Sequence, residues 1–341
     1  MKAFREITLV LLSCWIFVLA IFIAPPALCA TITWQSTGGT QRHDEGIQAL
    51  AFLPNELWVH VGDSITWTLP TPEIHTVTFL KQDATPQQVR PPRPGVPGGG
   101  CPGTTPDGSS FNGSTCVTSP ELVNGQTYTV TFPKAGNFKL VCLVHNNMTG
   151  VVHVLAPSEL LPHDQDFYDD LALKEEAELL SDGDRLKGQG TATAQRSSRD
   201  AVTVGIGEIV ATGGGSDTVS VMRFLEDSIV VRVGDTVEWT NLDPVTPHTV
   251  TFGTEPSGPP QPPSAGVTVD TDGARHAVLT SPAGSVHSGF LVAAFQDRVL
   301  LAQSPLGVTR FRVTFTTPGT FKYFCALHDD LGMVGRVIVH W

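Results

Sequence analysis

Charged residues are scarce in this chain, and basic residues are the scarcer kind. Only 16% of the 341 residues are charged, and 21 Lys and Arg stand against 33 Asp and Glu, for a net charge of −12. Nucleic acids bind to basic faces, so the composition excludes nucleic acid as an expected partner. Glycine (33) and proline (26) are frequent, and 41% hydrophobic residues is typical of folded proteins. We therefore expect an all-β protein, long enough for two domains.

Cysteine is also rare, and its six residues fall into three pairs. The pairs are Cys14 with Cys29 in an N-terminal segment, Cys142 with Cys325 in two ligand-rich motifs, and Cys101 with Cys116 in one loop. No histidine lies near the loop pair, which argues against a metal site there. We expect a Cys101–Cys116 disulfide, which could stabilise the fold by about 3 kcal/mol in an oxidising compartment.

The first 30 residues have the pattern of an export segment. Lys2 and Arg5 precede an uncharged apolar run at residues 7–24, and Pro25 begins a stretch that resembles a cleavage region. The run is also just long enough to cross a bilayer, so a removed signal peptide and an N-terminal membrane anchor both fit. We expect an extracytoplasmic protein, in the periplasm or at the outer face of the cytoplasmic membrane.

Two short motifs combine a thiol, an imidazole and a thioether. In each motif a cysteine is followed three residues later by a histidine, and a methionine comes three or five residues after that. Apolar residues alternate before each cysteine, which turns the thiol towards the packed face of a strand. Soft and borderline ligands of this kind suit copper, whereas structural zinc sites seldom use methionine. The two motifs are Cys142-His145-Met148 and Cys325-His328-Met333.

The surroundings of the motifs are duplicated as well. A His-Thr-Val-Thr-Phe stretch precedes each cysteine and begins at His75 or at His248. A Val-Gly-Asp-x-x-x-Trp stretch, ending at Trp67 or Trp239, comes before each of these histidines. We therefore predict tandem domains at residues 31–157 and 201–341, each with a distant histidine that converges on its motif.

Three further segments are expected to connect or decorate these domains. A polar, turn-rich stretch is expected after Thr31-Ile32-Thr33-Trp34, at the start of the first domain. Surface insertions rich in Pro and Gly are expected around residues 86–113 and 254–305. Residues 158–200 form an acidic linker. Leu173, Ala177 and Leu180 are spaced for a short amphipathic helix there, but a solvated spacer is the favoured interpretation.

Both halves resemble cupredoxins, the blue type 1 copper domains, because they share the motifs quoted above. The second motif is similar to plastocyanin and the first is closer to amicyanin in spacing. The resemblance implies a Greek-key β-sandwich and one type 1 copper ion in each half. The implied ligand sets are His75, Cys142, His145 and Met148, and His248, Cys325, His328 and Met333.

Two details of these ligand sets remain open in the sequence. The shorter first loop allows either Met148 or, in its place, Asn147 or a backbone carbonyl nearest the axis. Thr76 and Thr249 occupy the position after the first histidine, where plastocyanin has Asn, so the hydrogen bonding near each thiolate differs from that protein.

The resemblance implies an exported carrier of single electrons between redox partners such as cytochromes or membrane electron-transfer complexes. His145 and His328 would be exit points, and apolar neighbours would form a docking patch around them. These neighbours are Leu143, Val144, Ala326, Leu327 and Leu331. A copper carrier or store is an alternative, and so is an enzyme of the multicopper oxidase or copper nitrite reductase type.

Catalytic signatures are missing. Multicopper enzymes place extra histidines beside the type 1 ligands, but Val141 and Phe324 precede the two cysteines and no His-x-His pair occurs at either distant histidine. Gly205-Ile206-Gly207 also lacks the third glycine and the following helix of a phosphate-binding loop. We therefore predict a protein that is not an enzyme.

Overall fold

The computed structural model describes residues 31–341 except 82–83, 85–88, 90–98, 102–108, 146, 195–199, 258–261 and 293–307. The predicted export segment at residues 1–30, including the apolar run at 7–24, lies outside the described residues, as do large parts of both insertions. Within the described residues, no helix has both the length and the hydrophobicity required for a membrane span.

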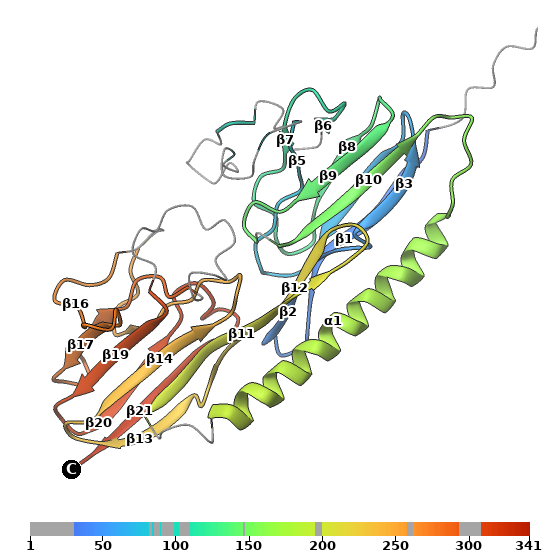
Figure 1. The fold of residues 1–341 in the computed structure, drawn as a ribbon. Helices are drawn as coiled ribbons and strands as arrows, with labels where there is room; N and C mark the ends of the chain where they lie inside the picture. Colours follow the sequence, from blue (N-terminus) through green and yellow to red (C-terminus); the bar gives the residue numbers. More distant parts are fainter. Residues whose placement is uncertain are drawn as a thin grey trace, which may run out of the picture. The chain divides into compact units, whose positions relative to one another are not determined.

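The first half is built from two β-sheets (Figure 1). One has the strand order β2-β1-β4-β8-β6, and the other has the order β3-β10-β9-β5-β7. The strands are β1 (Thr33–Gln41), β2 (Ile47–Leu53), β3 (Glu56–His60), β4 (Ser64–Leu69), β5 (Thr78–Phe79), β6 (Ser109–Ser110), β7 (Val117–Thr118), β8 (Gln126–Thr131), β9 (Gly136–Val141) and β10 (Thr149–Leu155).

The second half repeats this arrangement with one additional edge strand, β16. Its sheets have the orders β12-β11-β14-β19-β17-β16 and β13-β21-β20-β15-β18. The prediction of two tandem β-sandwiches is therefore confirmed. The strands are β11 (Ala201–Ala211), β12 (Ser216–Leu225), β13 (Ser228–Arg232), β14 (Thr236–Leu242), β15 (Thr251–Phe252), β16 (Thr268–Val269), β17 (Arg275–Leu279), β18 (Val286–His287), β19 (Arg310–Phe315), β20 (Gly319–Phe324) and β21 (Val334–His340).

Each half has its own aromatic core at the same place. Trp67 on β4 packs against Phe79, with ring centroids 5.7 Å apart, and Trp239 on β14 packs against Phe252 at the same distance. These rings are almost fully buried. Burying a large apolar side chain contributes about 1.5–3 kcal/mol, so each sandwich gains much of its stability from this cluster.

One expectation about the first half is wrong. The stretch after Trp34 forms β1 and β2 rather than polar turns, and every residue of β2 is buried. β2 pairs antiparallel with its counterpart β12 of the other half, in the register Leu50 opposite Thr218 and Ile47 opposite Val221. The two halves therefore share one continuous sheet, and β2 is interior because this pairing removes its free edge.

The acidic segment forms helix α1 (Gln165–Ala194), which is longer than the short helix considered from the sequence. Asp164 caps its N-terminus, because its carboxylate accepts a hydrogen bond of 3.1 Å from the Phe167 N–H. Leu180 is buried in the contact with the sheet, whereas Leu173 is 65% exposed. The helix lies along β1, β2, β11 and β12, and therefore covers the join between the halves (Figure 1).

Two glycines allow α1 to lie close to the sheet. A Cβ atom on Gly183 would lie 2.2 Å from Ile47 Cγ2, and one on Gly190 would lie 2.4 Å from Leu225 Cδ1. Side chains at these positions would push the helix away from β2 and β12. The segment is thus a packed element, not a solvated spacer.

The loop cysteines are bonded to each other. Cys101 and Cys116 form a disulfide, and Cys116 is buried directly before β7. The bond closes a loop between residues separated by 15 positions. It ties the middle of the first insertion to the sheet that carries the first metal-ligand motif.

Candidate metal centres

The first ligand set comes from three places in the chain. His75 lies just before β5 and is held by a backbone hydrogen bond of 3.1 Å to Leu122. Cys142 follows β9, and His145 lies in the loop that leads to β10. The Nδ1 atoms of the two histidines are 3.2 Å apart, and the Cys142 sulfur is 4.0 Å from His145 Nδ1. The structure thus brings the three predicted donors of the first half together.

The second set repeats this geometry. The Nδ1 atoms of His248 and His328 are 3.1 Å apart, and the Cys325 sulfur lies 3.9 Å and 3.5 Å from them. In both sets the three donor atoms lie within 4.8 Å of one another, and all the side chains are buried. Among the described residues, these two groups are the ones with such a metal-binding geometry.

The two methionines lie in the same loops as the cysteines and the loop histidines. Met148 and Met333 are fully buried in the same apolar clusters as Cys142 and Cys325, respectively. In both loops the cysteine N–H donates to the methionine carbonyl, and the methionine N–H donates to the histidine carbonyl. The carbonyl of Asn147, the alternative ligand, accepts a hydrogen bond of 2.9 Å from Ser216 Oγ. The Asn147 carbonyl is therefore held by the second half.

The threonines at the plastocyanin Asn position reach the thiols. The N–H of Thr76 lies 3.4 Å from the Cys142 sulfur, and its hydroxyl oxygen lies 4.0 Å from it. The hydroxyl also accepts a hydrogen bond of 2.8 Å from the Leu143 N–H, which leaves its own proton free for the sulfur. Thr249 makes the same contacts with Cys325, at 3.3 Å and 3.9 Å. Threonine therefore tethers the segment after each cysteine to the strand that carries the first histidine.

Two functional glycines were missed in the sequence. Gly39 and Gly205 lie at register shifts in β1 and β11, with φ of +78° and +67°. A Cβ atom there would lie 2.5 Å from Nε2 of His75 or 2.3 Å from Nε2 of His248. Glycine inside a strand signals a bulge or a close approach, and that signal was available in the Gly205-Ile206-Gly207 stretch.

The polar atoms of both clusters fit a bound cation. Within the described part of the chain, Nε2 of His75 has no hydrogen-bond partner, Nε2 of His248 faces the Asp243 carboxylate at 3.7 Å, and each Nδ1 faces another Nδ1. Burial would raise the pKa of each cysteine thiol, but the neighbouring histidines hold the pKa of Cys142 and Cys325 well below its usual value. The sites therefore favour the thiolate, the form of cysteine that binds metals.

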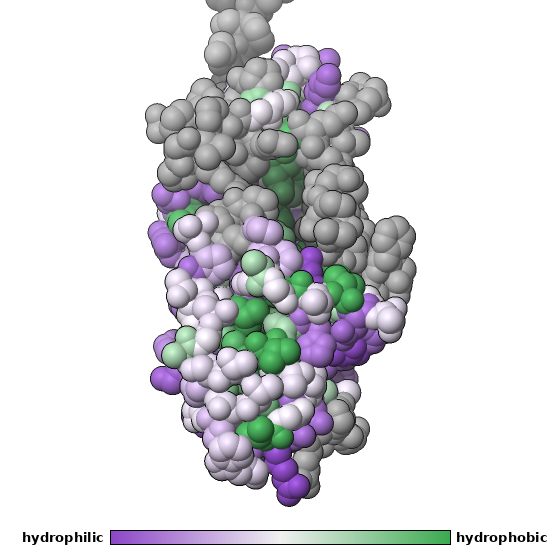
Figure 2. Space-filling view, turned by 90° about the vertical axis from the view of Figure 1, so that its left-hand side faces the viewer, coloured by the Kyte–Doolittle hydropathy of each residue, from purple (hydrophilic) through white to green (hydrophobic). Residues whose placement is uncertain are grey.

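The outer edges of the two loop histidines are buried. Nε2 of His145 lies 3.2 Å from a carboxylate oxygen of Glu73, and Nε2 of His328 lies 4.0 Å from the other oxygen. The two histidines are only 3% and 4% exposed, and Leu331 is buried in the first-half core. The two expected exit points are therefore covered and Leu331 is buried, whereas Leu143, Val144, Ala326 and Leu327 are half-buried. Figure 2 shows apolar groups on one face of the molecule, among polar side chains.

The two sites differ in the residue that lies near Nε2 of the distant histidine, His75 or His248. Asp243 lies 3.7 Å from Nε2 of His248 and is fully buried. Burial would raise the pKa of Asp243, but hydrogen bonding to His248 and Ser220 lowers it, so the carboxylate is charged. In the first half the corresponding position is Thr71, which is neutral.

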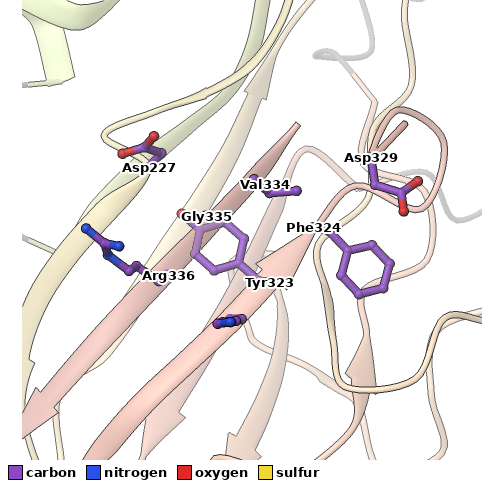
Figure 3. A pocket seen from close by; sticks show the side chains of 8 residues that line it. Asp227, Tyr323, Phe324, Asp329, Val334, Gly335 and Arg336 are labelled. Carbon is purple, nitrogen blue, oxygen red and sulfur yellow. The ribbon is translucent and has the colours of Figure 1, made fainter. Parts of the chain in front are cut away.

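A surface hollow of about 540 Å³ lies beside β20 and β21 in the second half. Tyr323 and Phe324 from β20, with Val334 and Arg336 from β21, contribute to its wall (Figure 3). Its lining contains none of the predicted ligands. The hollow is therefore distinct from the metal centre, although Phe324 directly precedes Cys325.

The comparisons with known proteins agree with this geometry. A family model described as "Copper binding proteins, plastocyanin/azurin family" matches residues 40–155 and 210–340, which is most of the chain. The chain belongs to this family. The cupredoxin resemblance expected from the motifs is therefore confirmed, and this plastocyanin/azurin family member has two His-Cys-His clusters, one in each half.

Each of the following relatives matches a segment shorter than one half of this chain. Plastocyanin of a Synechococcus species is 29% identical over 113 residues, which cover 33% of this chain and 60% of that protein. Plastocyanin of Dryopteris crassirhizoma is 28% identical over 123 residues, or 36% of this chain and 93% of that protein. The structure of oxidised Dryopteris plastocyanin covers 41% of this chain and 99% of its own, at 22% identity and a TM-score of 0.22.

Proposed function

We propose that the protein is an exported blue copper protein that carries single electrons through two type 1 copper sites. The observation that carries this proposal is the duplicated, buried cluster of two facing imidazole nitrogens and one thiol. Two histidines, a thiolate and a methionine suit both Cu(I) and Cu(II), so copper bound there would supply one-electron chemistry with little rearrangement.

The chain itself supports this role in three ways. The thiolates and Nδ1 atoms would hold the metal, and Met148 and Met333 would complete the two sites. Thr76 and Thr249 fix the cysteine loops, so the ligands need not move when the charge changes. Burial of all six His and Cys side chains excludes water from both centres.

The proposal places the protein outside the cytoplasm. The pattern of residues 1–30 supports export, with either a cleaved signal or an anchor at residues 7–24. The net charge of −12 supports partners that are neutral or basic where they dock. Cytochromes or membrane electron-transfer complexes are the expected classes of redox partner.

The alternatives have less support. A carrier or store should release its metal readily, whereas the donor side chains of both clusters are buried. A multicopper enzyme needs histidines next to the type 1 ligands, and Val141 and Phe324 occupy those positions. The proposed protein is therefore an electron carrier and not an enzyme.

Copper loading tests the proposal. The purified protein should bind two copper ions per chain and show intense thiolate-to-copper absorption in the red. Replacing Cys142 and Cys325 together by Ser should abolish the absorption, while His340→Ala, which changes an exposed histidine on β21, should leave it intact. Colourless protein, or red absorption that survives the double replacement, would reject the proposal.

A further inference from the structure

One carboxylate lies between the two metal centres. Glu73 is within hydrogen-bonding distance of His145 Nε2, at 3.2 Å, and its second oxygen is 4.0 Å from His328 Nε2. Because the two oxygens of a carboxylate are only about 2 Å apart, the two Nε2 atoms lie within roughly 10 Å of each other. Both imidazoles belong to the predicted ligand sets, one from each half.

The surroundings hold this arrangement in place. Residues Thr31–Trp341 form one compact unit, joined by the pairing of β2 with β12. Leu331, from the second ligand loop, packs in the first-half core. Ser216 donates a hydrogen bond to the Asn147 carbonyl in the first ligand loop. Each ligand loop is therefore anchored to the opposite half.

Glu73 also orients its histidine. A carboxylate accepts a hydrogen bond from Nε2–H of a neutral imidazole, which leaves the Nδ1 lone pair free to bind a metal. His145 needs that tautomer, because its Nδ1 faces His75 and Cys142. The Glu73 contact is consistent with metal binding at Nδ1.

The second half has no carboxylate at the position that corresponds to Glu73. The second half has one more residue between its Trp and its distant His, so Glu73 corresponds to Val245 or Thr246, neither of which is charged. Two carboxylates meeting between the loops would repel each other. One carboxylate therefore connects the two ligand sets, through a contact of 3.2 Å to His145 and an ion-pair distance of 4.0 Å to His328.

We propose that Glu73 bridges the two metal-ligand histidines and that electrons pass between the two copper sites inside one chain. The inference rests on the proposed function, since it needs copper in both sites. In this step one electron leaves the copper of one site, which goes from Cu(I) to Cu(II), and enters the copper of the other, which goes from Cu(II) to Cu(I). No atom is transferred and no further reactant is required.

Fast partial reduction of the full-length, copper-loaded protein tests the bridge. A substoichiometric pulse of a one-electron reductant should be followed by redistribution between the sites, at a rate independent of protein concentration. Cys142→Ser and Cys325→Ser each remove the thiolate of one site, so their spectra show which absorption belongs to which site. A second readout is the magnetic dipolar interaction between the two Cu(II) ions, which should report a short separation.

Three variants isolate the role of Glu73. Glu73→Ala should slow redistribution by at least an order of magnitude, because the polar contact between the imidazoles is lost. Glu73→Gln keeps the size and one acceptor oxygen, so its rate should lie between those of wild type and Glu73→Ala. Asp329→Ala removes an exposed carboxylate next to His328 and should leave the rate unchanged.

The outcomes separate this inference from the proposed function. If both sites take up copper and show the red absorption, but no concentration-independent phase occurs, the internal transfer is rejected. A wild-type rate in copper-loaded Glu73→Ala rejects the bridging role. Failure to bind copper at all instead rejects the proposed function itself.

Discussion

The two halves carry almost the same ligand cluster in different surroundings. The facing Nδ1 atoms are 3.2 Å apart in the first half and 3.1 Å apart in the second, and a threonine N–H reaches the sulfur at 3.4 Å and 3.3 Å. The charges beyond Nε2 differ. The first half has Glu73 at its loop histidine, and the second has Asp243 at its distant histidine.

The residues that the halves share and the residues in which they differ have separate roles in a metal site. The donors and the threonine set the identity of the metal and its ligand geometry, so both halves keep them. A charged group behind an imidazole changes how well the site tolerates each oxidation state, and it can vary while the ligands stay the same. We therefore expect two blue copper sites with unequal reduction potentials.

The largest effect should come from removing one thiolate at a time. Cys142→Ser and Cys325→Ser should each abolish the red absorption of one site and leave the absorption of the other, because the clusters use separate ligands. Copper analysis with visible spectroscopy measures this. Loss of both sites from a single replacement would contradict the independence of the two clusters.

A buried acid at the join between the halves should make stability depend on pH. Burial raises the pKa of Asp217 on β12 to about 8, and its side chain accepts a hydrogen bond of 3.1 Å from Asn55 in the first half. Burial likewise raises the pKa of Glu175 on α1 to about 7. Raised pKa values mean that the folded state holds these protons more tightly than the unfolded state does.

The free energy of unfolding should therefore fall by about 2–5 kcal/mol as the pH rises from about 5 to about 9, through the folded pKa values. Chemical denaturation across this range measures the slope. Asp217→Asn should flatten it, whereas Asp170→Asn, at an exposed position of α1, should not. An unchanged slope in Asp217→Asn would show that the join does not titrate.

The bulge glycines should be sensitive in both halves. Gly205→Ala places a Cβ atom 2.3 Å from His248 Nε2, and Gly39→Ala places one 2.5 Å from His75 Nε2. Each should destabilise the fold by about 1–3 kcal/mol and lower copper occupancy of its own site only. Gly234→Ala is a matched control, since it has positive φ but open space around the new Cβ atom. Equal copper loss in all three variants would mean that backbone strain, not the histidine contact, is responsible.

The smallest expected effect is the change in reduction potential when the charge of Asp243 is removed. A negative charge near His248 stabilises Cu(II) over Cu(I), so Asp243→Asn should raise the potential of the second site by about 40–90 mV, or about 1–2 kcal/mol. The first site serves as an internal control in a spectroelectrochemical titration. If its potential moved equally, or if the second potential fell, Asp243 would not be the source of the difference.

The sequence showed the ligands because they carry rare chemistry in a repeated order. His75, Cys142 and His145 were predicted to converge, and the structure places them together with their second-half counterparts. The supporting residues were harder to see. Gly39 and Thr76 are common residue types whose role depends on an atom brought from a distant strand, and no local pattern identifies that atom.

The relation between the halves was also invisible in the sequence. β2 carries an apolar run that could have signalled a strand, but its pairing with β12 depends on which edge each sandwich leaves free. Leu180 of α1 packs on that join, while Leu173, expected on the same face, points to solvent. Helical spacing gives a stripe of positions but not the surface against which the stripe packs.

The sequence by itself determined the duplicated β-sandwich, the two ligand sets and their preference for copper, because side-chain chemistry and strand periodicity are local properties. Only the tertiary structure decided that His145 and His328 are covered and that Glu73 lies between them. The reason is that burial and contact across a domain join depend on how two folded surfaces meet, and residues about 180 positions apart carry no local record of that meeting.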